Sequence, residues 1–193
     1  MPLTFLISFF SGLAAKLTDD LVDKKPHFGR KIKYFTAVAY GLLAGYLISS
    51  SAEFATLFLA VIAAVLLAGK IDDAAHFLAI IAIAAMVVLL GLPGIIPAFF
   101  VFFLAFAFLD EALPDIAAKK FGRSKKKQVA RQKIFGEGEK QAFGQKFLGS
   151  RFWLDIACFV LSLALNNWVY FFAIASFDIG YNAVAFAGII KSP

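Results

Sequence analysis

Apolar residues in this chain gather in long runs that are separated by short polar segments. The runs hold few charged residues, and a helix of about 17 to 25 such residues crosses a hydrocarbon layer about 30 Å thick. The pattern therefore predicts an all-α fold, a polytopic transmembrane helical bundle of about seven spans. The predicted spans are Leu3–Thr18, Tyr34–Ser49, Phe54–Gly69, Ala74–Leu92, Ile95–Leu109, Phe147–Ala164 and Trp168–Ile190.

The last two spans are separated in the sequence by a pair of asparagines, Asn166 and Asn167. At about 1.5 Å per residue, one helix over 152–190 would be nearly twice as long as the hydrocarbon layer is thick. We therefore expect a turn at the asparagine pair. Several other spans are short for a membrane crossing, so an arrangement with six spans stays open.

Basic residues fall on one side of the predicted spans. Six of them flank the first loop between residues 16 and 33, and ten more lie in the segment 110–146. With seven spans, all nineteen Lys and Arg residues lie on the same side. Because cytoplasmic segments carry an excess of Lys and Arg, we predict an N-terminus outside, a cytoplasmic C-terminus and a location in the cell membrane.

Composition agrees with a membrane protein. Hydrophobic residues make up 61% of the chain and charged residues 17%, against about 25% charged in soluble domains. The net charge of +6 arises at span flanks, where Lys and Arg set topology and contact anionic head groups. We therefore expect membrane lipids as partners and no nucleic acid, and predict a single integral membrane domain over 1–193 with a basic, partly helical cytoplasmic loop at about 110–146.

Acidic residues form three clusters at the predicted cytoplasmic ends of spans. Carboxylates grouped at this spacing suit Mg²⁺, which takes oxygen ligands and is often shared with substrate phosphates. Solvated ion pairs and helix caps are the structural alternatives for each cluster. The candidate metal ligands are Asp19, Asp20 and Asp23 after the first span, Asp72, Asp73 and His76 at the fourth, and Asp110 and Asp115 after the fifth.

The first cluster, Asp19-Asp20-Leu21-Val22-Asp23, has the form DDxxD. It is similar to the aspartate-rich motif of isoprenoid-diphosphate enzymes, including membrane-embedded prenyltransferases of the UbiA type. The resemblance covers these five residues and implies that a prenyl diphosphate binds through Mg²⁺. The candidate phosphate contacts in the neighbouring basic loop are Lys125, Lys126, Lys127 and Arg131.

Two further acids, Asp155 and Asp178, are predicted to lie deeper, about eight and ten residues into the sixth and seventh spans. An ionised side chain inside a membrane indicates a functional site, because it costs several kcal/mol unless it is paired or hydrated. Asp178 has no basic neighbour on its own predicted helix. These two residues predict an alternative function, a small transporter or channel for cations or protons.

Three functions therefore stay open: a Mg²⁺-dependent enzyme acting on a lipid or prenyl (di)phosphate at the cytoplasmic membrane face, a transporter or channel, and a non-catalytic scaffold. The enzyme requires carboxylates from separate helix ends to share one site, whereas the transporter requires Asp178 to face a polar cavity. The sequence also contains Gly41 and Gly45 in a GxxxG motif, which predicts close packing of that helix against a neighbour.

Overall fold

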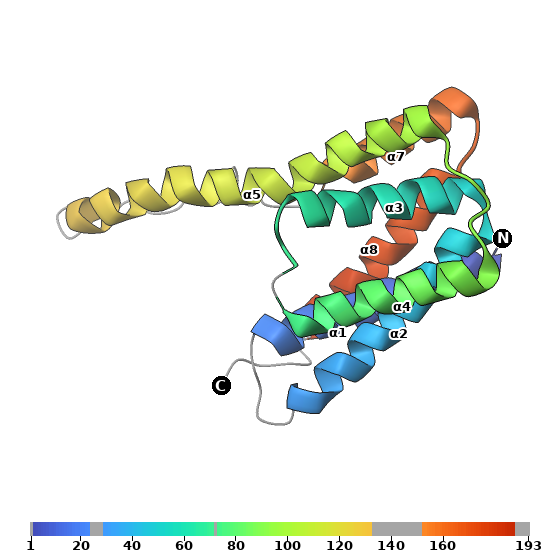
Figure 1. Ribbon diagram of the computed structural model, residues 1–193. Coiled ribbons are helices and arrows are strands. Elements are labelled where there is room, and N and C mark those ends of the chain that lie inside the picture. The colour runs from blue at the N-terminus through green and yellow to red at the C-terminus, as the bar shows by residue number, and fades with distance from the viewer. Residues whose placement is uncertain (1, 24–28, 72, 133–151, 188–193) are drawn as a thin grey trace.

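The computed structural model describes residues 2–23, 29–71, 73–132 and 152–187. Within these ranges the chain forms seven helices and no strand, which confirms the predicted all-helical class (Figure 1). The helices are α1 (Pro2–Asp23), α2 (Gly29–Ser50), α3 (Ala52–Leu67), α4 (Ala74–Leu90), α5 (Pro97–Gln132), α7 (Trp153–Leu165) and α8 (Val169–Ala187).

The predicted turn at the asparagine pair is confirmed. α7 ends at Asn166, which adopts the left-handed conformation with φ 51° and ψ 33°. Asparagine tolerates this conformation better than most residues because its short polar side chain can hydrogen-bond locally. Asn167 then accepts a hydrogen bond from the Val169 N–H at 3.2 Å, at the start of α8. The chain therefore reverses here and forms two helices.

Glycines allow two pairs of helices to pack at very short range. A Cβ atom on Gly12 of α1 would lie 2.0 Å from the backbone oxygen of Phe177 in α8, and one on Gly180 would lie equally close to the oxygen of Phe9. On α2, the GxxxG glycine Gly41 faces the backbone of α4 in the same way, as does Gly45 one turn later. The predicted packing role of the GxxxG motif is thus confirmed, with α4 as the neighbour.

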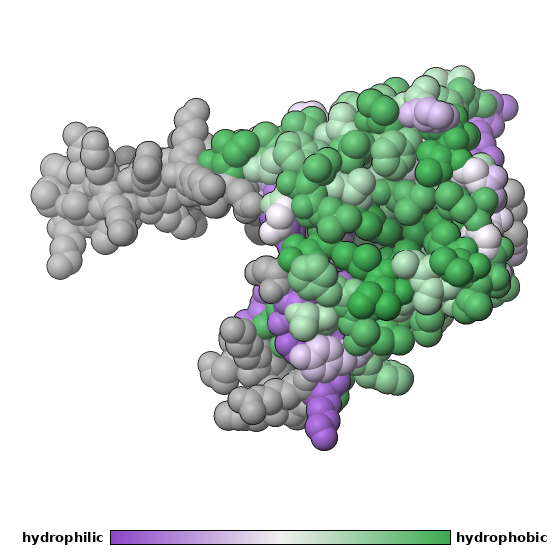
Figure 2. All heavy atoms as spheres, viewed as in Figure 1, coloured by the Kyte–Doolittle hydropathy of each residue, from purple (hydrophilic) through white to green (hydrophobic). Residues whose placement is uncertain are grey.

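Large apolar side chains cover the outside of the bundle as well as its core. Val88 is 84% exposed and Phe35 is 77% exposed. Figure 2 shows hydrophobic residues over most of the visible face of the bundle, with hydrophilic residues gathered at its ends. An apolar surface of this extent indicates contact with lipid or with other proteins.

Among the residues that the structure describes, two helical segments are long and apolar enough to cross a membrane, Lys31–Ser50 within α2 and Pro97–Pro114 within α5. They give support for membrane association. α3, α4, α7 and α8 are apolar but shorter. The 13 residues of α7 extend about 20 Å, less than the hydrocarbon thickness of about 30 Å. The described part of the chain therefore shows seven helices, and a bundle of seven membrane spans stays a prediction.

α5 continues well past Leu109, where the fifth span was predicted to end. It runs to Gln132 with Pro114 inside it, and its second half projects away from the bundle (Figure 1). Alanine, lysine, arginine and glutamine dominate this stretch and are strong helix formers. The first part of the predicted basic loop is therefore helical, and 133–146 lies outside the described residues.

Candidate functional site

A cavity of about 580 Å³ lies where α1, α3, α4 and α8 meet, towards one end of the bundle. Figure 1 shows that α1 and α3 end, and α2 and α4 begin, at this same end. The polar lining of the cavity comes from residues that are distant in the sequence. These are Ser11, Asp19 and Asp23 of α1, Tyr40 of α2, Lys70 after α3, His76 of α4, Glu111 of α5 and Tyr181 of α8.

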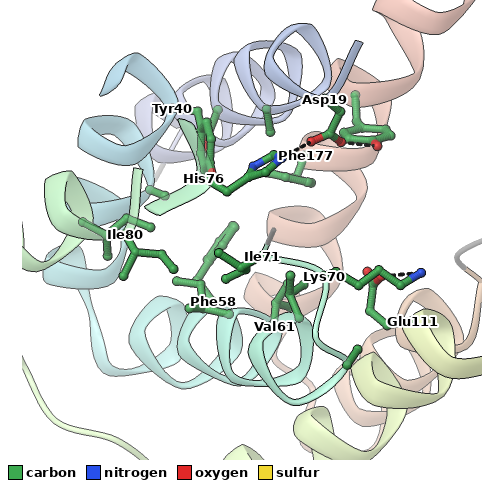
Figure 3. A pocket seen from close by; sticks show the side chains of 18 of the residues that line it. Asp19, Tyr40, Phe58, Val61, Lys70, Ile71, His76, Ile80, Glu111 and Phe177 are labelled. Atoms are coloured by element: carbon green, nitrogen blue, oxygen red, sulfur yellow. Dashed lines mark hydrogen bonds and ion pairs between the residues drawn. The ribbon is translucent and has the colours of Figure 1, made fainter. Parts of the chain in front are cut away.

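One side of the cavity is built around the carboxylate of Asp19. Tyr181 donates a hydrogen bond to Oδ2 at 2.6 Å, and Nε2 of His76 lies 3.9 Å from Oδ1 (Figure 3). Three helices, α1, α4 and α8, therefore converge on a single carboxylate. A hydrogen-bonded carboxylate of this kind can bind a cation or orient an imidazole.

Lys70 and Glu111 form the other polar side of the cavity. Nζ of Lys70 lies 3.6 Å from Oε2 of Glu111, and Figure 3 shows the pair across the cavity from Asp19 and His76. Glu111 is buried, whereas the Lys70 side chain is one-third exposed. The lysine is therefore the more accessible partner.

Between these polar groups the wall is apolar. Phe58, Val61 and Val65 of α3 face Ile80 and Ile83 of α4 across the cavity. Phe58 and Val65 are seven positions apart in α3, which corresponds to about 10 Å along the helix axis, less than half of a hydrocarbon layer. The cavity thus combines a polar rim with an apolar depth of the order of one membrane leaflet.

The DDxxD residues do not act as one group. Asp19 and Asp23 both line the cavity, as their spacing of four residues on a helix allows. Asp20 is buried outside the lining and pairs with Lys16, whose Nζ lies 3.2 Å from its Oδ1. The ammonium of Lys16 also lies 5.0 Å from the centre of the Tyr181 ring.

The second cluster is divided between a helix cap and the cavity. Asp73 is the N-cap of α4, accepts a hydrogen bond from the Ala75 N–H at 2.8 Å and pairs with Lys33 at 2.8 Å. The hydrogen bond from Lys33, followed by the one from Ala75, holds the pKa of the Asp73 carboxyl below its usual range. His76 reaches the cavity. Asp72 lies outside the described residues.

Asp110 caps a helix that follows it by more than forty residues. Its carboxylate is buried and accepts hydrogen bonds from the backbone N–H groups of Phe152, Trp153 and Leu154, at 3.1, 2.8 and 2.8 Å. These groups open α7, where a helix has unsatisfied N–H donors and a positive dipole end. The geometry gives Asp110 a structural role at this helix start.

The other predicted contacts of α5 lie along its projecting part. The backbone of α5 includes Asp115 and the four basic residues that were predicted to contact phosphate, Lys125, Lys126, Lys127 and Arg131. The side chains of these five residues lie outside the described part of the chain. Their roles as metal ligand and phosphate contacts stay predictions.

Asp155 lies at a different depth from the one predicted. It is the third residue of α7, in the first turn, because the described helix begins at Trp153. Asp178 is the tenth residue of α8, as predicted, and its carboxyl interacts with that of Asp155. Asp178 also lines a small second cavity of about 30 Å³ together with Asp110 and Glu111. The two deep acids are therefore neighbours.

Within the described ranges, no group of three or more His, Cys, Asp or Glu side chains is arranged to hold one metal ion. The sequence analysis did not identify Lys70, Tyr40 or Tyr181 as cavity residues. Comparison with known proteins found no matching family, no matching curated protein and no matching solved structure.

Proposed function

We propose that this protein is an integral membrane enzyme that acts, with Mg²⁺, on a lipid or prenyl (di)phosphate at the cytoplasmic face of the cell membrane. The observation that carries the proposal is the cavity, which joins a rim of charged and hydrogen-bonding groups to an apolar wall about 10 Å deep. An amphiphile with a polar head and one apolar chain has this distribution of polarity. Pockets of about 300 to 1,000 Å³ are typical of small-molecule sites.

The charges at the rim support a metal-bridged head group. The carboxylates of Asp19, Asp23 and Glu111 outnumber the one lysine in the described lining, Lys70. A phosphate entering such a rim without a cation would meet net repulsion. Mg²⁺ binds through one or two carboxylates together with substrate phosphates and water, so Asp19 and Asp23 suffice without a third protein ligand.

The membrane placement is supported by two observations. Two helices have the length and composition of membrane spans, and large apolar side chains cover the outside of the bundle. The N-terminus outside and the basic segments in the cytoplasm follow from the positive-inside rule. In this orientation the rim of the cavity faces the cytoplasm, where soluble co-substrates and Mg²⁺ are available.

The proposal is tested with the full chain in lipid nanodiscs, using Mn²⁺ as a paramagnetic substitute for Mg²⁺. We expect bound Mn²⁺ by electron paramagnetic resonance, tighter binding when a single-chain prenyl diphosphate is added, and Mg²⁺-dependent change of that diphosphate by ³¹P NMR. Asp19→Asn should weaken Mn²⁺ binding at least about tenfold. Glu53→Gln, which removes a carboxylate from the first turn of α3, is the matched control.

The proposal fails if the wild-type protein binds neither Mn²⁺ nor the prenyl diphosphate. It also fails if Asp19→Asn and Glu53→Gln have equal effects, because the binding would then not depend on the cavity. Binding of the diphosphate without any chemical change would assign the protein to lipid binding and not to catalysis.

A second candidate function, cation or proton transport, is favoured by one observation. Asp178 lines the small cavity beside Asp110 and Glu111, and its carboxyl interacts with that of Asp155. Paired acids inside a membrane protein are typical of proton and ion pathways. Flux of protons or monovalent cations into proteoliposomes, lost in Asp178→Asn and retained in Asp19→Asn, would select transport over catalysis. Absence of flux, metal binding and lipid binding together would favour a scaffold.

A further inference from the structure

Lys70 is a basic cavity residue to which the proposed function gives no role. It is the one lysine in the described part of the lining, which contains no arginine. The sequence directed attention to the basic residues of the projecting part of α5, whose side chains lie outside the described part of the chain. We propose that Lys70 is the direct contact for the anionic head group, so that the cavity selects phosphate-bearing amphiphiles over neutral ones. The inference rests on the proposed function, because it assigns a ligand class to the same cavity.

The backbone fixes the position of Lys70 at the end of α3. Gly69 has φ +67°, its N–H donates to the Leu66 oxygen at 3.0 Å, and the Lys70 N–H donates to the Val65 oxygen at 3.2 Å. These two bonds form a Schellman motif, in which glycine occupies the left-handed position after the helix cap. Lys70 is the last residue of this motif, and its own backbone bond thereby places it at the rim of the cavity.

Glu111 holds the Lys70 side chain near the cavity without enclosing it. The 3.6 Å separation of Nζ and Oε2 is longer than a charge-assisted hydrogen bond, for which about 2.7 to 2.9 Å is typical. The ammonium has three N–H donors. It can therefore donate to a phosphate oxygen while it stays close to Glu111.

The arrangement across the cavity gives the head group two different contacts. Figure 3 shows Asp19 and His76 on one side of the cavity, and Phe58, Val61, Lys70 and Glu111 on the opposite side. A metal ion on the Asp19 side would bridge one set of phosphate oxygens. Lys70 would bind another set directly, and the apolar chain would lie against α3. Both contacts require an anionic head group.

The test compares probes that share one alkyl chain and differ in head group. The full chain is placed in nanodiscs of zwitterionic lipid, in a buffer that contains Mg²⁺. Binding is then measured for three probes, hexadecyl phosphate, hexadecyl maltoside and hexadecyltrimethylammonium. We expect Lys70→Gln to weaken hexadecyl phosphate binding about tenfold or more, because a hydrogen bond to a charged group is lost. Maltoside binding should change less than twofold, and Lys70→Arg should retain most of the phosphate affinity.

Lys31→Gln is the matched control, since Lys31 is an exposed lysine of α2 at the same end of the bundle. Lys31→Gln should leave the affinity for every probe unchanged. If it weakens hexadecyl phosphate binding as much as Lys70→Gln does, the effect comes from general surface charge and the inference is overturned. Equal losses for phosphate and maltoside in Lys70→Gln would also overturn it. Thermal unfolding of each variant shows whether the fold is retained.

Two further results separate this inference from the proposed function. Failure of the wild-type protein to bind any of the probes would overturn both. Binding of all probes with no preference that depends on Lys70 would overturn the inference alone. Inorganic phosphate is added as a competitor, and only weak competition is expected if the site binds a lipid head group. Competition as strong as that of hexadecyl phosphate would indicate a site for free phosphate and would overturn the lipid assignment.

Discussion

The contacts of α4 with α2 differ sharply from the space between α4 and α3. On the α2 side, Gly41 and Gly45 bring two backbones so close that an added Cβ would lie within 2.6 Å of a neighbouring atom. On the α3 side, Phe58, Val61 and Ile80 line a cavity of about 580 Å³. Small residues allow helices to join closely, whereas branched and aromatic side chains keep the helices apart around this cavity. Residue size therefore determines where the helices of this bundle pack closely and where they leave room for a ligand.

The largest expected effect comes from breaking the close contact of α1 with α8. Gly12→Ala should lower the free energy of unfolding by about 3 kcal/mol, the upper range for an overpacked contact, because its Cβ would lie 2.0 Å from the Phe177 oxygen. Thermal unfolding in detergent measures the loss. Ala15→Ser, on the same helix at the cavity lining, is the control and should unfold near the wild-type temperature.

The next effect concerns Asp110, where a structural role and a metal role give different results. Asp110→Ala removes three hydrogen-bond acceptor contacts from the start of α7, and should cost about 2 kcal/mol. Asp23→Ala, at an exposed carboxylate of the same end, should cost little. If Asp110→Ala leaves stability unchanged and abolishes Mn²⁺ binding, Asp110 is a metal ligand and the capping role is wrong.

A smaller loss is expected at the end of α3. Gly69→Ala forces a residue with a Cβ into the left-handed region, which costs about 1 to 2 kcal/mol. Because Gly69 also sets the direction of Lys70, binding of an alkyl phosphate should weaken together with stability. Calorimetry on the same samples gives both quantities, and a stable variant with unchanged phosphate binding would contradict the positioning by Gly69.

The ion pair of Asp73 with Lys33 should contribute less than about 1 kcal/mol. Since the pKa of Asp73 is lowered in the folded protein, this contribution is complete above the unfolded value of about 3.9. It is lost as the pH falls below that value. Asp73→Asn keeps a good helix cap and should remove the acid sensitivity that this pair adds to the unfolding curves below about pH 4. If the pH dependence of unfolding is the same in Asp73→Asn and in the wild type, the contribution assigned to this ion pair is wrong.

The smallest effect on stability is expected where the helices stand apart. Val61→Phe places extra volume in the cavity, and should change the free energy of unfolding by less than about 0.5 kcal/mol. The same change should weaken binding of hexadecyl maltoside and hexadecyl phosphate alike. Severe destabilisation instead would mean that the cavity is as tightly packed as the glycine contacts.

The sequence predicted the features that depend on local pattern. The apolar runs predicted the helices, the asparagine pair predicted the turn between α7 and α8, and the GxxxG motif predicted a close helix contact. The continuation of α5 was predicted only as partial helix, because the change from apolar to basic residues concealed a stretch of uniformly strong helix formers.

The site was predictable only in part, because its contacts join residues far apart in the chain. Asp19 and Tyr181 are 162 positions apart, and nothing in either local sequence indicates their hydrogen bond. The DDxxD pattern identified Asp19 and Asp23 as neighbours on one face, but it could not show that Asp20 turns towards Lys16. Gly69 before Lys70 was a readable signal for a helix end, and it would have drawn attention to the lysine that follows.

The hydrogen bonds from Phe152, Trp153 and Leu154 to Asp110 have a consequence for the whole chain. They hold the start of α7 against Asp110 of α5, which lies 42 residues before Phe152 in the chain. The segment between Asp110 and Phe152 is therefore held together at its two ends. A change in its length or composition would alter the entropy of loop closure only slightly. A proteolytic cut in this segment would leave both fragments held in the bundle. The segment can therefore be exchanged in evolution while the rest of the bundle stays the same.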